Sequence, residues 1–380
     1  MTSSQRDLFA AGVRAERRAL FGLATAAVSD RVSTELGTAL AESDPLILAR
    51  DAQRLQVHTL IGPVLVRHPA LATRLPTDLV LFFRAMHAAN RQRIDQGLAQ
   101  LEEIGAALDA AGIPAVVLKG GGDMLSPIHA DPAIRYVGDL DILVPGSRAR
   151  DALAAMSRLG AAPAAPPAHE SSRFDWRGQR LSEHHLPRLV RSDWGFPVEI
   201  HIHAGPGATA AVLDTIAVLE RCVPTAVHGL SIACAEDRAC HLLTHVTRHG
   251  GMVNLRAWID WSALRGRCDH ATVASRLRQA GCARTFETCD LMADLLEAKG
   301  TLAMPRRETA LARTALHAFG DAGAKSAADV ARFLFRRCRG LILSPAYRRH
   351  IADRLRKNGL LGCSKPCRQP CPKLWRGPKD

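Results

Sequence analysis

Two aspartates at the head of an apolar run could together bind a metal ion. Asp139 and Asp141 open the segment 139–144, in which apolar residues occupy the alternate positions. Residues i and i+2 of a strand point to the same face. Two neighbouring carboxylates repel unless a cation lies between them, and Mg²⁺ is usually held by one or two carboxylates plus substrate phosphates. The pair therefore predicts a divalent metal site; the alternative is two solvated aspartates at a strand end.

A glycine-rich segment upstream could bind phosphates. Residues 119–122 read KGGG and follow the apolar run 114–118. Backbone N–H groups of a glycine turn can approach phosphate oxygens closely, and one loop separates this turn from the aspartates. Lys119 could neutralise a triphosphate as a point charge, and Arg135 could do so with a bidentate guanidinium. The alternatives are a strand-end lysine and a surface-loop arginine.

A third carboxylate lies in the segment 196–203. Apolar and polar residues alternate there, and Glu199, His201 and His203 take the polar positions. An unpaired carboxylate in mid-strand is costly if it is buried. If this strand lies beside 139–144, three acidic side chains meet on one face, as two-metal phosphoryl transfer requires. Otherwise Glu199 belongs to the half-exposed polar face of an edge strand.

Three histidines repeat at helical spacing. His241, His245 and His249 lie at i, i+4 and i+8 and therefore share one helix face. Such a ladder extends over ~12 Å, which is too long for one tetrahedral zinc ion. A polar face that lines a cleft is the better interpretation, and we expect this face near the acceptor or the nucleotide.

Short strands between long helical regions must position these residues. Apolar periodicity predicts helices over 1–110, with the longest at 79–110, and again over 208–319. Strands are predicted at 115–118, 139–144 and 196–203, with weaker candidates at 174–176 and 185–190. Short helices are predicted after the glycine turn, to residue 125, and over 147–159, the latter capped by Ser147 and ended by Gly160. The pattern indicates an α+β fold.

Composition suggests four regions along the 380-residue chain. They are a helical region 1–95, a core 96–205 that carries the acids, a helical region 206–327, and a basic helix with a disordered tail at 328–380. The formal net charge of +13 is concentrated in the tail, where residues 331–380 carry 14 Lys/Arg against 2 Asp/Glu. Residues 1–330 are nearly neutral, which is not typical of a domain that binds nucleic acid. The basic tail could contact an acidic partner.

The cysteines and the hydropathy indicate the compartment. The ten cysteines are scattered, as is typical of reduced thiols in a cytosolic protein. In the tail, Cys363, Cys367 and Cys371 are spaced more widely than most zinc ligands, and the Pro-rich composition favours an unstructured segment. No stretch has the ~18 apolar residues that a membrane span needs. We therefore expect a cytoplasmic protein.

Together these motifs resemble one known family. Lys119-Gly120, Arg135, the run 138–144 (GDLDILV) and Glu199-Ile200-His201 are similar to the pattern of the uncharacterised bacterial nucleotidyltransferases of the polymerase-β-type superfamily. The likeness covers about residues 40–265. It implies a small mixed-sheet nucleotidyltransferase core with helices behind it, flanked by helical segments on both sides.

The resemblance also implies roles for single residues. By position, Gly120 and Gly121 would hold phosphates, Asp139 and Asp141 would bind both metal ions, and Glu199 would bind the ion on the nucleophile's side. We expect these three acids to be the catalytic set.

Further residues would complete the site. Lys119, Arg135 and His201 would join the glycines in binding the nucleotide. The helical segment from His241 onward is also similar to the family, and it would support the acceptor through His245, His249, Arg256 and Asp260. In that group, Asp260 would orient Arg256 or a histidine.

The function expected from these residues is nucleotidyl transfer. The enzyme would move a nucleoside monophosphate from an NTP to an acceptor hydroxyl, with Mg²⁺ or Mn²⁺, and release pyrophosphate. The acceptor would be a small molecule, a protein or an RNA. Two alternatives stay open: a non-catalytic nucleotide- or RNA-binding regulatory protein on the same scaffold, and a phosphohydrolase in which water is the nucleophile.

Overall fold

The computed structural model describes residues 13–164, 184–205, 208–248 and 255–297, together with Ala312 and Ala315. Several of the features predicted above lie outside these residues: the candidate strand 174–176, His249, the basic segment 328–380 and its three cysteines.

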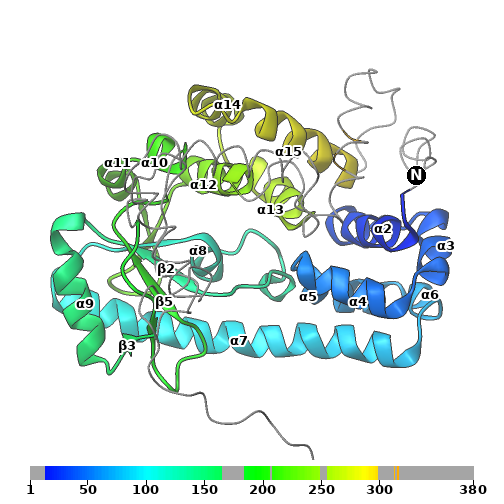
Figure 1. Cartoon of the computed structure of the whole chain (residues 1–380), viewed down its shortest axis with the longest axis horizontal. Coiled ribbons are helices and arrows are strands. Elements are labelled where there is room, and N and C mark those ends of the chain that lie inside the picture. The colour runs from blue at the N-terminus through cyan, green and yellow to red at the C-terminus, as the bar shows by residue number, and fades with distance from the viewer. Residues whose placement is uncertain are drawn as a thin grey trace, which may run out of the picture. The chain divides into compact units, whose positions relative to one another are not determined.

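The centre of the fold is one mixed sheet (Figure 1). In spatial order its strands are β3 (Ala162–Pro163), β4 (Leu189–Val190), β5 (Val198–His201), β2 (Leu140–Leu143), β1 (Val116–Leu118), β7 (Ser231–Ile232) and β6 (Val223–Pro224). β2 pairs in parallel with β5, β1 pairs in parallel with β7, and the other pairs are antiparallel. The three strands predicted with most support are thus the neighbours β1, β2 and β5, and the α+β prediction is confirmed.

Helices precede the sheet in the chain, separate its strands and follow it. Before it come α2 (Ala15–Ser29), α3 (Thr34–Glu42), α4 (Pro45–Arg54), α5 (His58–Arg67), α6 (Pro69–Ala72) and α7 (Thr77–Ala110). Between its strands in the chain lie α8 (Lys119–Leu125), α9 (Ala149–Arg158), α10 (Ala208–Val212), α11 (Thr215–Glu220) and the 3-10 turns η1 (Pro132–Ile134) and η2 (Gly146–Arg148). After its last strand come α12 (Ala235–Arg248), α13 (Leu255–Arg265), α14 (His270–Gln279) and α15 (Ala283–Leu296).

The long helix α7 ends where the sequence predicts. Gly112 takes the left-handed conformation with φ +60°, which glycine adopts without steric cost. Its N–H donates to Asp109 O at 2.8 Å, and the Ile113 N–H donates to Leu108 O at 3.0 Å, the two bonds of a Schellman motif. The described helices, α7 included, lack the combination of length and apolarity that crossing a bilayer needs.

One prediction about α9 is wrong. Ser147 does not cap it, because the chain first makes the 3-10 turn η2 and the helix begins at Ala149. The reason is a tertiary contact: the Arg148 guanidinium donates to Ala111 O at 2.8 Å and Gly112 O at 2.9 Å, at the C-terminus of α7. These bonds anchor the chain before the helix starts and satisfy carbonyls that α7 leaves open.

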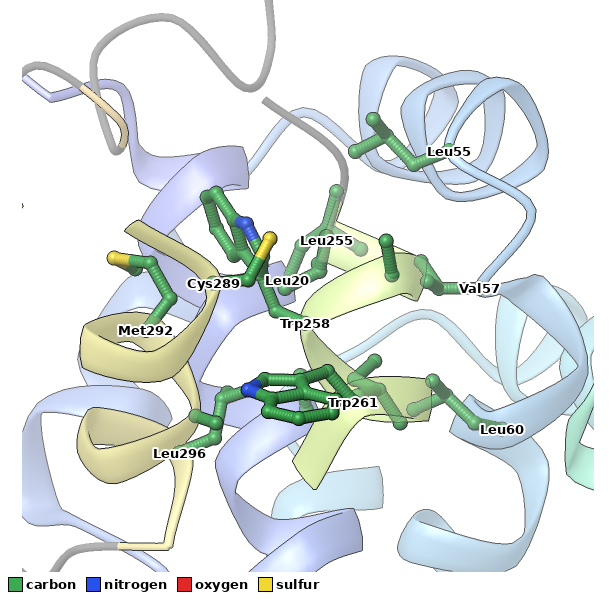
Figure 2. Close-up of a cluster of buried hydrophobic side chains, with 14 of the residues drawn as sticks. Leu20, Leu55, Val57, Leu60, Leu255, Trp258, Trp261, Cys289, Met292 and Leu296 are labelled. Atoms are coloured by element: carbon green, nitrogen blue, oxygen red, sulfur yellow. The ribbon is translucent and has the colours of Figure 1, made fainter. Parts of the chain in front are cut away.

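Helices that precede the sheet in the chain share one hydrophobic core with helices that follow it. Trp258 and Trp261 of α13 are fully buried between Leu20 of α2 and Met292 of α15 (Figure 2). The Trp261 indole N–H donates to Asp290 Oδ1 at 3.2 Å, which satisfies its polar atom. Burying an aromatic side chain of this size removes a large apolar area from water, so the two helical regions stabilise each other.

A second core fixes the two faces of the sheet. Leu140, Ile142, Val198 and Ile200 pack against α7 and α9. Because side chains alternate along a strand, the residues between them point to the opposite face. That opposite face carries Asp141, Glu199 and His201.

Candidate active site

The register of β2 and β5 brings the predicted acids together. In this parallel pair Asp141 lies opposite Glu199, and Leu143 lies opposite His201. Since the side chains of directly paired residues share a face, the Asp141 and Glu199 carboxylates converge. Asp139 immediately precedes β2, two positions from Asp141, and reaches the same cluster.

Asp141 is the most buried of the three acids, with 1% of its side chain exposed. The Lys119 ammonium donates to its Oδ1 at 2.6 Å, and His201 Nε2 lies 2.7 Å from the same oxygen. Burial raises the pKa of the carboxyl, but Lys119 and His201 outweigh burial and hold this pKa well below its usual range. Asp141 Oδ2 is buried without a hydrogen-bond partner among the described residues.

Arg188 joins the other two acids. Its Nη2 lies 3.0 Å from Glu199 Oε1 and 3.3 Å from Asp139 Oδ2. Burial raises the pKa of Glu199, but His201 and His185 lower it more, to about 2. The pKa of Asp139 is raised instead, because burial and the neighbouring Asp141 charge both disfavour ionisation. No signal in the sequence marked Arg188, which lies just before the short strand β4.

These residues fit a divalent cation. Asp141, Glu199 and His201 each offer one ligand atom, and the three atoms lie within 4.8 Å of one another. The unpartnered Asp141 Oδ2 is a buried acceptor that a cation would satisfy. Two carboxylates with one imidazole suit Mg²⁺ or Mn²⁺ through oxygen, and Mn²⁺ tolerates the nitrogen better. The His201 ring is 0% exposed and lies among the carboxylates, and its contact with nucleotide stays a prediction.

Arg135 lies at the centre of a second buried ionic cluster. Its Nε is 3.0 Å from both Asp123 Oδ2 and Asp260 Oδ2. Asp260 also contacts His129 Nε2 through Oδ1 at 3.0 Å, and Arg256 Nε lies 3.6 Å from its Oδ2. Asp260 therefore contacts Arg256 and a histidine, as expected, but the histidine comes from a loop rather than from the helical ladder. Two carboxylates already compensate the Arg135 charge that was expected to face a triphosphate.

The histidine face of α12 lines a pocket. His241 and His245 border it together with Lys119 at the start of α8 and Arg256 of α13. His241 is 5% exposed. Burial and the nearby Lys119 ammonium lower the pKa of its imidazole well below the usual value, so the ring is neutral. The predicted cleft beside the ladder thus borders the lysine that contacts Asp141.

Comparison with known families decides the assignment. Residues 42–298, more than half of the chain, match the model of a family described as uncharacterised nucleotidyltransferase. The chain belongs to this nucleotidyltransferase family. Neither the curated proteins nor the solved structures contain a match to it.

The glycines of this nucleotidyltransferase do not form a separate turn, as had been expected. They lie inside α8, which starts at Lys119 directly after β1, and all three are buried. A Cβ at Gly121 would lie 2.7 Å from Val117 Cγ1, and one at Gly120 would lie equally close to Val137 Cγ1. Close packing of α8 on the sheet therefore accounts for the small residues. Lys119 takes φ +46°, which is uncommon for a non-glycine residue, and its ammonium is held by Asp141.

We predict that Gly122→Ala destabilises the protein by about 1–3 kcal/mol, the usual cost of overpacking. The new methyl group would lie 2.8 Å from the Val117 carbonyl oxygen, which is backbone and cannot rotate away. Urea denaturation followed by circular dichroism measures the effect. Gly146→Ala is the control, because nothing lies within 4 Å of a Cβ at that position. Equal midpoints for the two variants would contradict the packing account.

We predict that Arg188→Gln tightens the binding of Mn²⁺ about three- to tenfold. The variant removes the cation that bridges Asp139 and Glu199, so a divalent ion no longer competes with it. Exposed ion pairs contribute up to about 1 kcal/mol each, which limits the gain to this range. Electron paramagnetic resonance of free Mn²⁺ measures the affinity.

Arg191→Gln is the matched control for this experiment. Arg191 also bridges two carboxylates, those of Glu103 and Asp193, but neither belongs to the acid cluster. We expect its Mn²⁺ affinity to equal that of the wild type. Weaker binding in Arg188→Gln would mean that the arginine organises the carboxylates for the ion rather than competing with it.

Proposed function

We propose that this protein is a Mg²⁺- or Mn²⁺-dependent nucleotidyltransferase that moves a nucleoside monophosphate from an NTP to an acceptor hydroxyl and releases pyrophosphate. Membership of the nucleotidyltransferase family supports the reaction class. The observation that carries the proposal is the pairing of Asp141 with Glu199 across β2 and β5, with Asp141 Oδ2 buried and unpartnered.

The carboxylates would hold the divalent ions. Asp141 and Glu199 would do so together with His201, and Asp139 would join them when Arg188 releases it. When bound, such ions neutralise charge on the triphosphate and lower the pKa of the attacking hydroxyl. The sheet contributes positioning: paired strands fix both carboxylates relative to each other, so their geometry needs little reorganisation during the reaction.

The chain's own cations would have to rearrange as the substrate enters. Lys119 occupies Asp141 Oδ1 and Arg188 occupies Glu199 Oε1. Both side chains are flexible and partly exposed, so each can exchange its carboxylate for a phosphate oxygen of the nucleotide. In that exchange the NTP would bring the divalent ion to the carboxylates. Its phosphates would then bind the Lys119 and Arg188 side chains that the ion displaces.

The test is Mg²⁺-dependent NTP binding and turnover by the full-length protein. Calorimetry with each of the four common NTPs should detect binding that chelation of the divalent ion weakens. Turnover with a hydroxyl-bearing acceptor should yield pyrophosphate, whereas orthophosphate as the product would identify a phosphohydrolase. If no NTP binds in the presence of Mg²⁺ or Mn²⁺, the proposal fails.

One observation favours a second candidate, a non-catalytic nucleotide-binding protein on the same scaffold. Lys119, Arg188 and His201 already neutralise much of the acid cluster. A scaffold that never binds a metal ion could be stable in this form. An NTP affinity that neither EDTA nor Asp141→Asn changes, without any turnover, would support this candidate over the enzyme.

We also infer a reducing, cytoplasmic environment. The six cysteines within the described ranges are all free thiols. Burial raises the pKa of Cys240 and of Cys289 to about 12 in each case, so neither is a reactive thiolate. Labelling intact cells with a membrane-impermeant thiol reagent tests the inference, since a cytoplasmic protein stays unlabelled until lysis.

A further inference from the structure

A pocket lies between the end of β1, helix α8 and the helices α12 and α13. Its cavity volume is about 70 Å³. Lys119 borders it and also contacts Asp141, so the pocket adjoins the acid cluster. Its remaining polar lining comes largely from the C-terminal helices, through Arg238 and His241 of α12 and Arg256 of α13.

The lining carries more positive than negative charge. Its cations are Lys119, Arg135, Arg238 and Arg256, and its carboxylates are Asp123 and Asp260. Arg135 lies between both carboxylates, Arg238 contacts Asp123, and Lys119 has Asp141 as its counterion. Three carboxylates thus face four cations. Arg256 is the least compensated, because among the described carboxylates it reaches Asp260 alone, at 3.6 Å, and Arg135 shares that carboxylate.

His241 and one nitrogen of Arg256 line the pocket without a hydrogen-bond partner among the described residues. His241 is 95% buried, and within the described residues its ring nitrogens make no hydrogen bond. Arg256 bonds through Nη1 to Gln56 Oε1 and to Tyr136 O, and its Nε faces Asp260. Its Nη2 has no partner in the part of the chain that the structure describes. Both groups line the pocket and can donate into it, so an anionic ligand with several acceptor oxygens would give each of them a partner.

The strand order indicates on which side of Asp141 the pocket lies, and hence which reacting group faces it. β2 lies between β5 and β1, so Glu199 lies on one side of Asp141, and Lys119, at the end of β1, lies on the other. Nucleotidyl transfer is an in-line displacement in which the attacking and leaving oxygens are on opposite sides of the phosphorus. If the acceptor hydroxyl is activated at Glu199, the leaving group departs toward Lys119 and the pocket.

We propose that this pocket, completed by α12 and α13, binds the β- and γ-phosphates of the NTP and receives them as pyrophosphate. The inference rests on the proposed function. The acceptor oxygen forms a bond to the α-phosphorus while the bond from that phosphorus to the bridging oxygen breaks. The electron pair of the broken bond leaves on the bridging oxygen, and the acceptor proton passes to solvent. Arg256, His241 and Lys119 contact the departing phosphates.

Pyrophosphate binding in EDTA tests the pocket without any turnover. Calorimetry on the full-length protein should show pyrophosphate binding more tightly than orthophosphate. We expect Arg256→Gln to weaken it about 10- to 100-fold, because a charge-assisted contact is lost, and Arg256→Lys to restore part of the affinity. His241→Leu should weaken it about three- to tenfold while removing no hydrogen bond within the described protein. Arg150→Gln, on the exposed surface of α9, should bind like the wild type.

The results distinguish failure of the pocket proposal from failure of the proposed nucleotidyl transfer. Asp141→Asn should bind pyrophosphate at least as tightly as the wild type, since it removes a neighbouring negative charge, although it abolishes turnover under the proposed function. The pocket proposal is overturned if wild type does not bind pyrophosphate at millimolar concentration, or if Arg256→Gln and His241→Leu both bind it like Arg150→Gln. Absence of turnover together with pocket-dependent pyrophosphate binding would overturn the reaction and leave the anion site standing.

Discussion

Asp141→Asn is expected to lower the rate of NTP-dependent pyrophosphate release about a thousandfold or more. Asp141 is the buried carboxylate shared by Lys119, His201 and the candidate metal site. Losing a metal ligand removes several kcal/mol of transition-state stabilisation, and each 1.36 kcal/mol corresponds to a factor of ten in rate. The assay is steady-state pyrophosphate release at saturating Mg²⁺.

Two further measurements separate a catalytic role of Asp141 from a structural one. Mn²⁺ affinity should fall together with the rate, while the far-ultraviolet circular dichroism spectrum stays that of the wild type. Asp151→Asn is the control, because Asp151 is exposed on α9 and its one ion pair within the described ranges is with Arg148. A variant with Asn at 141 that keeps both the rate and the Mn²⁺ affinity would remove Asp141 from the mechanism.

Asp260→Asn is expected to cost about 3–5 kcal/mol of folding stability, the usual penalty for breaking a buried ion pair from one side. The Asp260 side chain is 2% exposed and contacts Arg135, His129 and Arg256. Within the described part of the chain, loss of this charge leaves Arg135 with Asp123 alone and Arg256 without a carboxylate partner. Urea denaturation at pH 7 measures the loss. Asp151→Asn serves again as control and should cost less than about 1 kcal/mol, since its pair is exposed.

The effect of Asp260 should also depend on pH. Burial raises the pKa of this carboxyl, but Arg135 and His129 outweigh it and hold the pKa well below the usual value. A depressed pKa in the folded state stabilises the protein above the unfolded-state pKa of about 4, and the stabilisation is lost as the pH falls below it. The stability difference between wild type and Asp260→Asn should therefore be smaller at pH 3 than at pH 7. A constant difference would mean that Asp260 acts by packing and not by charge.

The sequence anticipated features that depend on local periodicity. Alternation along 196–203 placed Glu199 and His201 on one face, and the i, i+2 spacing did the same for Asp139 and Asp141. These assignments need only the pleat of a strand, which is independent of the neighbouring strand. The end of α7 was equally predictable, since a glycine in the left-handed conformation at the C-terminus is a local device.

Other parts of the candidate site depend on contacts that no local pattern encodes. Arg188 reaches Asp139 from 49 positions away, and Arg135 reaches Asp260 from 125 positions away. No periodicity marks His129 as a site residue. Asp123 directly follows the glycine segment, for which the sequence predicts phosphate binding and not an ion pair with Arg135. Ser147 was assigned as a helix cap from its type alone, and the contact of Arg148 with α7 moved the start of the helix.

The sequence by itself determined which acidic residues are candidates for the site and on which face of its strand each one lies, because side-chain alternation is a property of a single extended segment. Only the tertiary structure decided that β2 and β5 are neighbours in a register that pairs Asp141 with Glu199. It also decided that the glycines pack inside α8 and that α12 and α13 bring arginine and histidine to the pocket beside Lys119. Strand pairing and helix packing minimise the free energy of the whole chain, so they follow from burial and hydrogen bonding among distant segments.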